Sequence, residues 1–207
     1  MSDPRTELVG RGNDEIGETF IGWRDRIVGD PRQRWADALA SRLPDGARVL
    51  ELGCGAGVPD TQLLAERCRV TGVDISRNQI ERARVSVPSA DFLQEDFTSL
   101  ELEPGSFEAV AAFYSFNHVP RDLLSDLFRR IYLWLVPGRL FMAALGVSDT
   151  EGWIGDFLGA PTYFSSFPPE TNRLPLRDAD FDLLLDEVVT FLEPEGEASF
   201  QWVLARR

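Results

Sequence analysis

Strand-like and helix-like segments alternate along the middle of the chain, and this alternation constrains the fold more than any other feature. Strand-like segments occupy residues 47–52, 68–75, 91–96, 107–116 and 139–145. Helical patterns separate most of them. Such alternation predicts a mostly parallel sheet with right-handed crossovers and helices on both faces. Ligands of these sheets bind beyond the carboxyl ends of the strands.

Helix start signals support this division of the chain. Ser76 and Gln79 form a capping box, and Pro120 opens a longer helix. Pro137 and Gly138 are expected to end that helix. Its predicted apolar stripe consists of Leu124, Leu127, Phe128, Ile131 and Leu135.

The two ends of the chain differ from its middle. Residues 1–12 are polar, and we expect them to be mobile. Residues 13–44 are predicted to form a helical cap, in which Asp30 and Pro31 begin one helix. Residues 181–192 and 198–207 have the pattern of two strands joined by a short turn, which predicts an antiparallel hairpin at one edge of the sheet. We therefore expect one domain over residues 1–207.

Composition excludes several classes of function. The 207 residues carry a formal net charge of −13, so the surface repels nucleic acid. Cys54 and Cys68 are the only cysteines and His118 is the only histidine, which supports neither a disulfide framework nor a metal cluster. We see neither a signal peptide nor an apolar run of roughly 18 residues. We expect a cytoplasmic protein that binds no membrane.

The segment VLELGCGAG, residues 49–57, indicates a ligand held close to the backbone. Gly53, Gly55 and Gly57 alternate directly after a strand, unlike the G-x-G-x-x-G fingerprint of dinucleotide-binding loops. Asp74 ends the next strand, where a carboxylate can accept hydrogen bonds from ribose hydroxyls. No basic residue lies between Val49 and Glu66, so a phosphate is disfavoured. The pattern predicts a ribose-containing ligand that is cationic and lacks phosphate.

Three motifs together carry a resemblance to a known family. VLELGCGAG, VTGVDIS and QEDF, at the ends of successive predicted strands, resemble the first three motifs of the class I S-adenosylmethionine-dependent methyltransferases. The resemblance covers about residues 30–207. It implies a Rossmann-like α/β three-layer sandwich with a mostly parallel seven-stranded sheet and an antiparallel last strand. It also implies S-adenosyl-L-methionine as the cofactor.

The resemblance assigns cofactor contacts to individual positions. The loop from Glu51 to Gly57 would border the methionine part, although an acid at Glu51 could instead cap the turn. Asp74 would bind the ribose. The remaining contacts implied along the cofactor are Gly53, Cys54, Gly55, Ile75, Asp96, Phe97 and Phe113. For Asp96, a solvated strand end is the alternative.

His118 is the candidate catalytic residue. It follows the fourth predicted strand, beside the position expected for the reactive end of the cofactor. A histidine with a pKa of about 6.5 can take the proton that a phenol or ammonium acceptor must lose. A contact to the substrate or the cofactor and a structural role at the start of the next helix are the alternatives.

Residues 148–170 are predicted to form an aromatic lid over the active site. Glycines and prolines break any long helix in this segment, and its aromatic side chains need a surface to cover. A packed surface excursion or a dimer contact is the alternative. The expected substrate-binding residues are Tyr114, His118, Trp153, Tyr163 and Phe164.

The sequence therefore favours an enzyme that methylates a small, partly apolar molecule. Two other classes stay open: a protein of the same fold with a non-methylating activity such as a cyclisation, and, less favoured because of the glycine spacing, an NAD-dependent oxidoreductase. A monomer or homodimer is expected.

Overall fold

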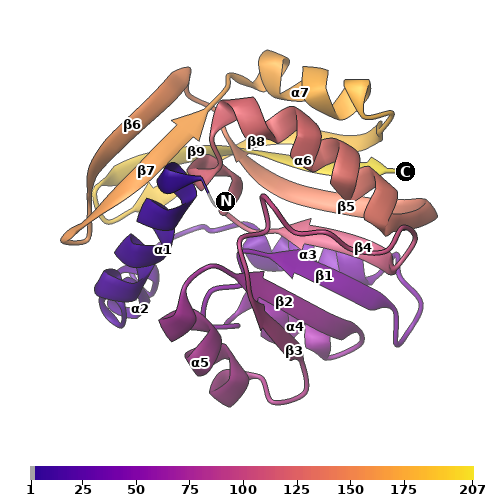
Figure 1. Cartoon of the computed structure of the whole chain (residues 1–207), viewed down its shortest axis with the longest axis horizontal. Helices are drawn as coiled ribbons and strands as arrows, with labels where there is room; N and C mark the ends of the chain where they lie inside the picture. Colours follow the sequence, from indigo (N-terminus) through magenta and orange to yellow (C-terminus); the bar gives the residue numbers. More distant parts are fainter. Residues whose placement is uncertain (1–2) are drawn as a thin grey trace.

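A seven-stranded sheet runs through the centre of the computed structural model, which describes residues 3–207 (Figure 1). The strand order is β3-β2-β1-β4-β5-β9-β8; the first five are parallel, and β9 is antiparallel to both neighbours. This arrangement confirms the predicted fold class. The strands are β1 (Arg48–Leu52), β2 (Arg69–Asp74), β3 (Asp91–Gln94), β4 (Phe107–Ala112), β5 (Leu135–Gly146), β8 (Asp182–Glu193) and β9 (Gly196–Arg206).

Helices cover both faces of the sheet (Figure 1). One face packs against α3 (Arg32–Ala40), α4 (Asp60–Ala65) and α5 (Arg77–Ser86), the other against α6 (Arg121–Trp134) and α7 (Pro169–Asp178). In β1, Val49 faces the first group and Leu50 faces α6. Alternate residues of a strand point to opposite faces, so a strand buried on both sides must be apolar throughout.

Some ends of the elements follow the sequence signals and others do not. The Ser76 hydroxyl accepts a hydrogen bond from the backbone N–H of Gln79 at 3.1 Å, as its predicted capping role requires. Helix α3 begins at Arg32, one residue after the predicted start at Pro31, and β4 ends at Ala112 instead of continuing to Phe116. Helix α6 stops at Trp134. Leu135 pairs with Phe107 and begins β5, so Pro137 and Gly138 lie in a strand and the prediction for this helix end was wrong.

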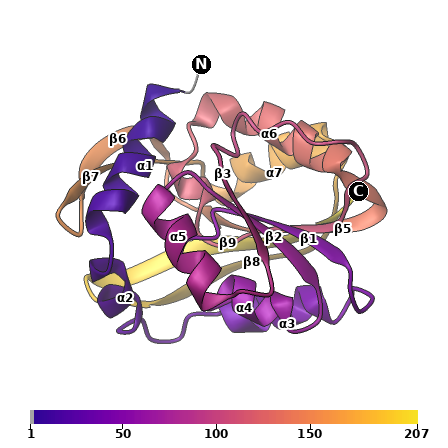
Figure 2. The same ribbon diagram turned by 60° about the horizontal axis from the view of Figure 1, so that its bottom comes forward.

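The N-terminal segment is ordered against the rest of the fold, contrary to the prediction of a mobile start. Helix α1 (Pro4–Ile16) runs beside β7 (Ala160–Ser166), and α2 (Thr19–Arg24) follows it (Figure 2). Thr6 and Val9 are buried. A Cβ at Gly12 would lie 2.7 Å from the backbone oxygen of Pro161, so this glycine allows the close approach. Of the range 1–12, residues 1 and 2 lie outside the described residues.

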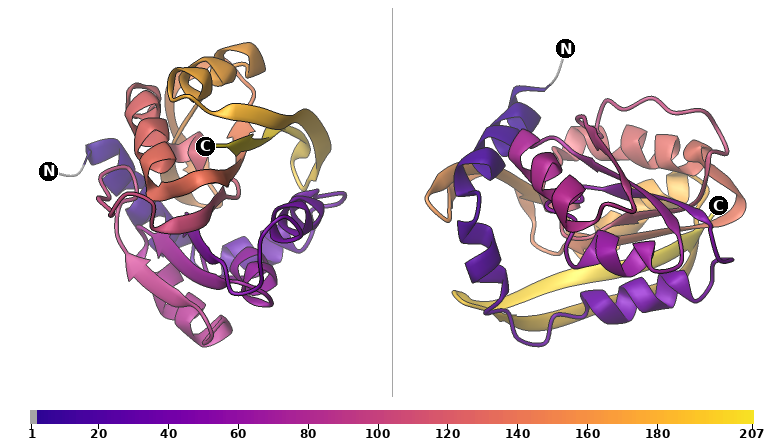
Figure 3. Two further views of the ribbon diagram at one scale, coloured as in Figure 1. Left: turned by 90° about the vertical axis from the view of Figure 1, so that its right-hand side faces the viewer. Right: turned by 90° about the horizontal axis from the view of Figure 1, so that it is seen from below.

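The predicted aromatic segment forms a separate antiparallel hairpin of β6 (Thr150–Phe157) and β7. The hairpin and the N-terminal helices stand at the same end of the molecule (Figures 2 and 3). Figure 3 also places α2 near the turn between β8 and β9, where the indole N–H of Trp23 donates to Glu195 at 2.8 Å. Among residues 3–207, no helix is both long and apolar enough to cross a membrane.

Candidate active site

A cavity of about 770 Å³ lies beyond the carboxyl ends of the five parallel strands. The loops after each of these strands contribute to its wall, as expected for a sheet of this type. Helices α1 and α2, the β6–β7 hairpin and the ends of β8 and β9 supply most of the rest, with Arg32, Asp60 and Gln79 from α3, α4 and α5. The volume falls within the range of roughly 300–1,000 Å³ typical of ligand pockets.

The glycine loop and Asp74 form one wall of this cavity. The Asp74 carboxylate is buried and accepts hydrogen bonds from the backbone N–H groups of Gly55 (2.8 Å) and Ser76 (2.9 Å). Gly53 has φ +75°, and a Cβ there would lie 2.3 Å from Cβ of Ser115. Burial raises the pKa of Asp74 to about 6, against the lowering effect of the two backbone donors.

The adjoining wall carries the second predicted carboxylate. Asp96 accepts from the Thr6 hydroxyl at 2.6 Å and from the backbone N–H of Thr98 at 2.8 Å. Ile75 and Phe97 also line the cavity. The first helix of the chain thus contacts the wall that the third motif builds.

A buried ionic cluster lies at another end of the cavity. The Arg32 guanidinium bonds Asp30 at 2.5 Å and Asp60 at 3.2 Å, and lies 4.7 Å from the centre of the Tyr114 ring. The Tyr114 hydroxyl donates to Asp30 at 2.6 Å. Burial raises the pKa of Asp60 to about 6, although Arg32 and Arg24 oppose this. Arg24 and Arg32 both line the cavity; Arg32 is paired with two carboxylates, and Arg24 is paired with Asp25 at 2.9 Å.

Tyr114 has the left-handed backbone conformation, with φ +58°. This conformation is costly for a residue with a side chain and persists only where its surroundings fix it. Two contacts of Tyr114 hold it in this conformation. Its hydroxyl donates to Asp30, and its ring meets the Phe200 ring edge-on, with 4.7 Å between the ring centres. Tyr114 and its neighbour Phe113 line the cavity.

Three of the predicted site residues do not line the cavity. Glu51 is buried behind the glycine loop and accepts from the Thr61 hydroxyl at 2.5 Å; its pKa lies well above the usual range because it is desolvated beside Asp60. Gly57 packs against Val87 of the α5 end. The Tyr163 ring points toward α1, with the Arg5 guanidinium 5.9 Å from its centre.

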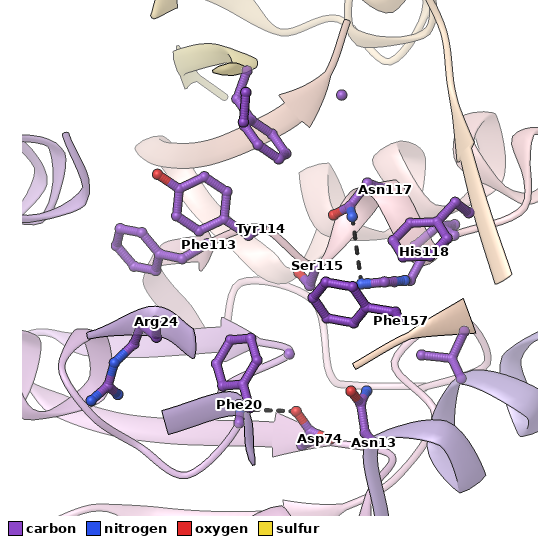
Figure 4. A pocket seen from close by; sticks show the side chains of 18 of the residues that line it. Asn13, Phe20, Arg24, Asp74, Phe113, Tyr114, Ser115, Asn117, His118 and Phe157 are labelled. Carbon is purple, nitrogen blue, oxygen red and sulfur yellow. Dashed lines mark hydrogen bonds between the residues drawn. The ribbon is translucent and has the colours of Figure 1, made fainter. Parts of the chain in front are cut away.

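His118 lies where the hairpin meets the loop after β4 (Figure 4). Its Nδ1 is 2.9 Å from the carbonyl oxygen of Tyr163, which can only accept, so Nδ1 carries the hydrogen. Its Nε2 therefore keeps a lone pair, with the Asn117 side-chain amide nitrogen 3.4 Å away. Burial lowers the pKa of His118 below its usual value, so the ring is neutral at pH 7.

Aromatic side chains close the cavity over the histidine. The Phe164 ring lies 4.7 Å from the His118 ring and 5.6 Å from Trp153. Phe157 meets Phe164 edge-on at 5.9 Å and Trp23 at 5.4 Å. The hairpin and α2 therefore touch through aromatic contacts, and the wall they form is apolar.

Sequence comparison agrees with this geometry. Residues 49–138, which include the glycine loop, Asp74, Asp96 and His118, match a family model described as a methyltransferase domain. Trans-aconitate 2-methyltransferase of Paracidovorax citrulli is 42% identical over 81 residues, covering 37% of this chain and 31% of the relative. The 27-O-demethylrifamycin SV methyltransferase of Amycolatopsis mediterranei is 30% identical over 141 residues, covering 58% and 52%.

The glycine loop, Asp74, Asp96 and His118 thus lie in the part of the chain that resembles a methyltransferase domain. The chain spans about half the length, or less, of the two curated relatives above. A crystal structure with the same fold is that of Burkholderia thailandensis 1,6-didemethyltoxoflavin-N1-methyltransferase. Its TM-score is 0.71 at 22% identity, over 100% of this chain and 91% of that one.

The residues of the cavity fit a sulfonium nucleoside that ends in an amino acid. The buried Asp74 carboxylate suits a ribose diol, and the guanidinium groups of Arg24 and Arg32 suit a further carboxylate beside their present partners Asp25, Asp30 and Asp60. At the glycine loop, the absence of a Cβ at Gly53 lets the backbone approach Ser115 closely.

Several cavity residues were missed by the sequence analysis. Thr6 lies in a segment expected to be mobile, and Arg24 and Arg32 belong to no short motif. Asn117 directly precedes the candidate base but was not predicted as a site residue. One signal was available for the arginines: both occur in a helical cap that the fold places over the site, and an acidic protein leaves few cations to bind a carboxylate.

Proposed function

We propose that this chain transfers a methyl group from S-adenosylmethionine to a small, partly apolar acceptor. The observation that carries the proposal is the Asp74 carboxylate, buried in the wall of a cavity beside a glycine loop that contains no basic residue of its own. The family match and the aromatic wall around His118 support it further.

Bound S-adenosylmethionine supplies a methyl group on a sulfonium sulfur, which a nucleophile can displace without further activation of the methyl donor. The contribution of this chain is to position the two reactants and exclude water. Asp74 would hold the ribose, while Arg24 and Arg32 would hold the carboxylate. Asp96 would accept from the adenine amino group, with Ile75 and Phe97 on either side.

His118 would act as the general base. Its Nε2 keeps the lone pair because Nδ1 donates to the Tyr163 carbonyl. The lowered pKa of His118 leaves the ring neutral at pH 7 and able to take a proton. Trp153, Phe157 and Phe164 would form the apolar part of the acceptor pocket.

The test of the proposed function is release of S-adenosylhomocysteine in the presence of candidate acceptors. Phenols, amines, carboxylic acids and thiols cover the nucleophiles that such a cavity could take. Turnover with one class identifies the acceptor chemistry. Tight binding of S-adenosylmethionine without turnover on any class favours the non-methylating alternative, and calorimetric binding of NAD instead would favour the oxidoreductase. Location in the cytoplasm and a monomeric or homodimeric state stay predictions.

Asp74→Ala is expected to weaken S-adenosylmethionine binding at least tenfold, about 1.4 kcal/mol, because the ribose hydroxyls lose their acceptor. Isothermal calorimetry measures this directly. Asp91→Ala, an exposed acid at the other end of the neighbouring strand β3, is the matched control and should leave the affinity unchanged.

A cofactor analogue separates the ribose contact from damage to the loop, since Asp74 also binds two backbone N–H groups. S-adenosylhomocysteine lacking the ribose hydroxyls should bind the wild type and Asp74→Ala equally well. Equal loss of affinity for both ligands would remove Asp74 from the ribose site. In the wild type, affinity should fall as the pH drops below the Asp74 pKa of about 6, because the carboxylate form is the better acceptor.

A further inference from the structure

The Asn117 carboxamide makes one hydrogen bond among the described residues, and that bond is to His118. Its nitrogen lies 3.4 Å from Nε2 of the ring, at the long end of the hydrogen-bond range (Figure 4). Its oxygen Oδ1 is buried and has no partner in residues 3–207. Buried amide oxygens are nearly always bonded, so this one needs an explanation.

Nothing but the histidine fixes which way this carboxamide points. In most buried asparagines, partners on both the oxygen and the nitrogen fix the orientation. Here the far atom has no partner in the part of the chain that the structure describes, so either orientation leaves one atom unpaired. The protonation state of His118 therefore selects the orientation, because a lone pair on Nε2 attracts the amide N–H and a hydrogen on Nε2 attracts Oδ1.

Among the groups around His118, the Asn117 carboxamide is the one whose orientation can stabilise a charged ring. Phe164 packs on the ring from β7, and the Tyr163 carbonyl occupies Nδ1. The charged side chains on neighbouring elements are Arg5, over the Tyr163 ring, and Arg121, at the end of β7; they pair with Asp122 and Asp149 respectively. No carboxylate bonds the ring in residues 3–207, so an imidazolium formed there has only oxygens of uncharged groups to accept from it.

We propose that Asn117 is the positioning residue of His118. Its carboxamide donates to Nε2 while the ring is neutral and turns over to accept from Nε2 once the ring has taken the proton of the methyl acceptor. This inference rests on the proposed function. The acceptor it implies is a protic group, O–H or N–H, whose bonding electrons form the new bond to the methyl carbon while its proton moves to Nε2. The carbon–sulfur bonding pair stays on sulfur, and the positive charge passes from the sulfonium to the imidazolium.

The single histidine of the chain makes the test direct. An ¹⁵N-detected titration of the imidazole in the free protein reports both the pKa and the tautomer, with no assignment problem. The wild type should show an unprotonated Nε2 above its pKa. Asn117→Leu keeps the size of the side chain and removes the acceptor, so the His118 pKa should fall by roughly one unit. Asn117→Asp should raise it by roughly one unit or more.

Asn13→Leu is the control, because Asn13 lies on another part of the cavity wall, in α1 (Figure 4), and should leave the His118 pKa unchanged. If the pKa and tautomer of His118 are the same in wild type, Asn117→Leu and Asn117→Asp, the proposed coupling is wrong. Loss of fold in Asn117→Leu is recognised from its urea transition, and Asn117→Ser then replaces it, with the same expected direction.

Kinetics separate the failure of this inference from that of the proposed function. With a protic acceptor, Asn117→Leu should lower kcat and leave KM unchanged, and Asn117→Asp should restore part of the loss. Turnover that depends on His118 but not on Asn117 would overturn the inference and leave the proposed function intact. If the His118 pKa changes in the Asn117 variants but the protein transfers no methyl group, Asn117 and His118 are coupled and the coupling has no role in catalysis.

Discussion

Replacing His118 by glutamine is expected to lower kcat for a protic acceptor by about 10²–10⁴, the usual contribution of a general base. Glutamine can occupy similar space and donate to the Tyr163 carbonyl, but its amide nitrogen cannot take a proton. Cofactor affinity should be unchanged, because the contacts expected for the cofactor come from other residues. The initial rate of S-adenosylhomocysteine release and calorimetry measure the two quantities.

The pH dependence of the wild type gives an independent check on the same residue. The neutral form is the active one, and burial lowers the pKa of His118 below its usual value of 6.5. The rate should therefore be constant above pH 6.5 and fall only at lower pH. Added imidazole should restore part of the activity of His118→Ala. If His118→Gln keeps the full kcat, His118 is not the general base and has a structural role or contacts the substrate.

Gly53→Ala should reduce the free energy of unfolding by about 2–6 kcal/mol. A side chain at φ +75° costs roughly 1–3 kcal/mol. The new Cβ would also lie 2.3 Å from Cβ of Ser115, and such overpacking costs a further 1–3 kcal/mol or so. Urea denaturation of the protein without ligand measures the difference.

Gly55→Ala is a closely matched control, since Gly55 also has a positive φ, +53°, but a Cβ there meets no atom within 4 Å. It should show the backbone cost alone. Combining Gly53→Ala with Ser115→Gly removes the clash, so the double variant should be more stable than the sum of the single effects implies. Equal destabilisation by Gly53→Ala and Gly55→Ala would show that the loop relaxes away from Ser115.

The sheet could be predicted from the sequence because its strands are buried on both faces and its helices carry recognisable caps. Val49 and Leu50 point to opposite layers, so their segment reads as continuous apolar sequence. Ser76 caps α5 in the way its spacing with Gln79 indicates. Local signals and tertiary packing agree in these elements.

The β6–β7 hairpin was not predicted as strands because its glycines resemble loop residues. In the structure they make room for aromatic rings: a Cβ at Gly155 would lie 1.9 Å from the Trp153 ring, and one at Gly152 would lie 2.7 Å from the Tyr163 hydroxyl. Glycine in a strand commonly marks such a close approach. The single sequence shows the glycines but not the rings that cover them.

Helix α1 was mistaken for a mobile segment for a related reason. Its buried apolar side chains, Val9 and Ile16, are too few to form a helical stripe, and its other buried positions are Thr6, Gly10 and Gly12. A Cβ at Gly10 would lie 3.2 Å from Ile75, so the backbone of α1 lies close to the cavity wall there. The positions of Asp74 and Asp96 could be predicted, since each follows a strand in a parallel sheet. Arg24 and Arg32 reach the cavity through chain reversals that no local pattern encodes.

The cavity wall draws on residues from Thr6 to Phe200, whereas the family match ends at Gly138. A fragment cut to residues 49–138 would keep Asp74, Asp96 and His118. It would lose Trp23 and Phe164 above the site, together with the Tyr163 carbonyl that sets the tautomer of the histidine. The segment that matches the family model is thus only the floor of the cavity, and the smallest unit able to enclose two reactants is nearly the whole described chain.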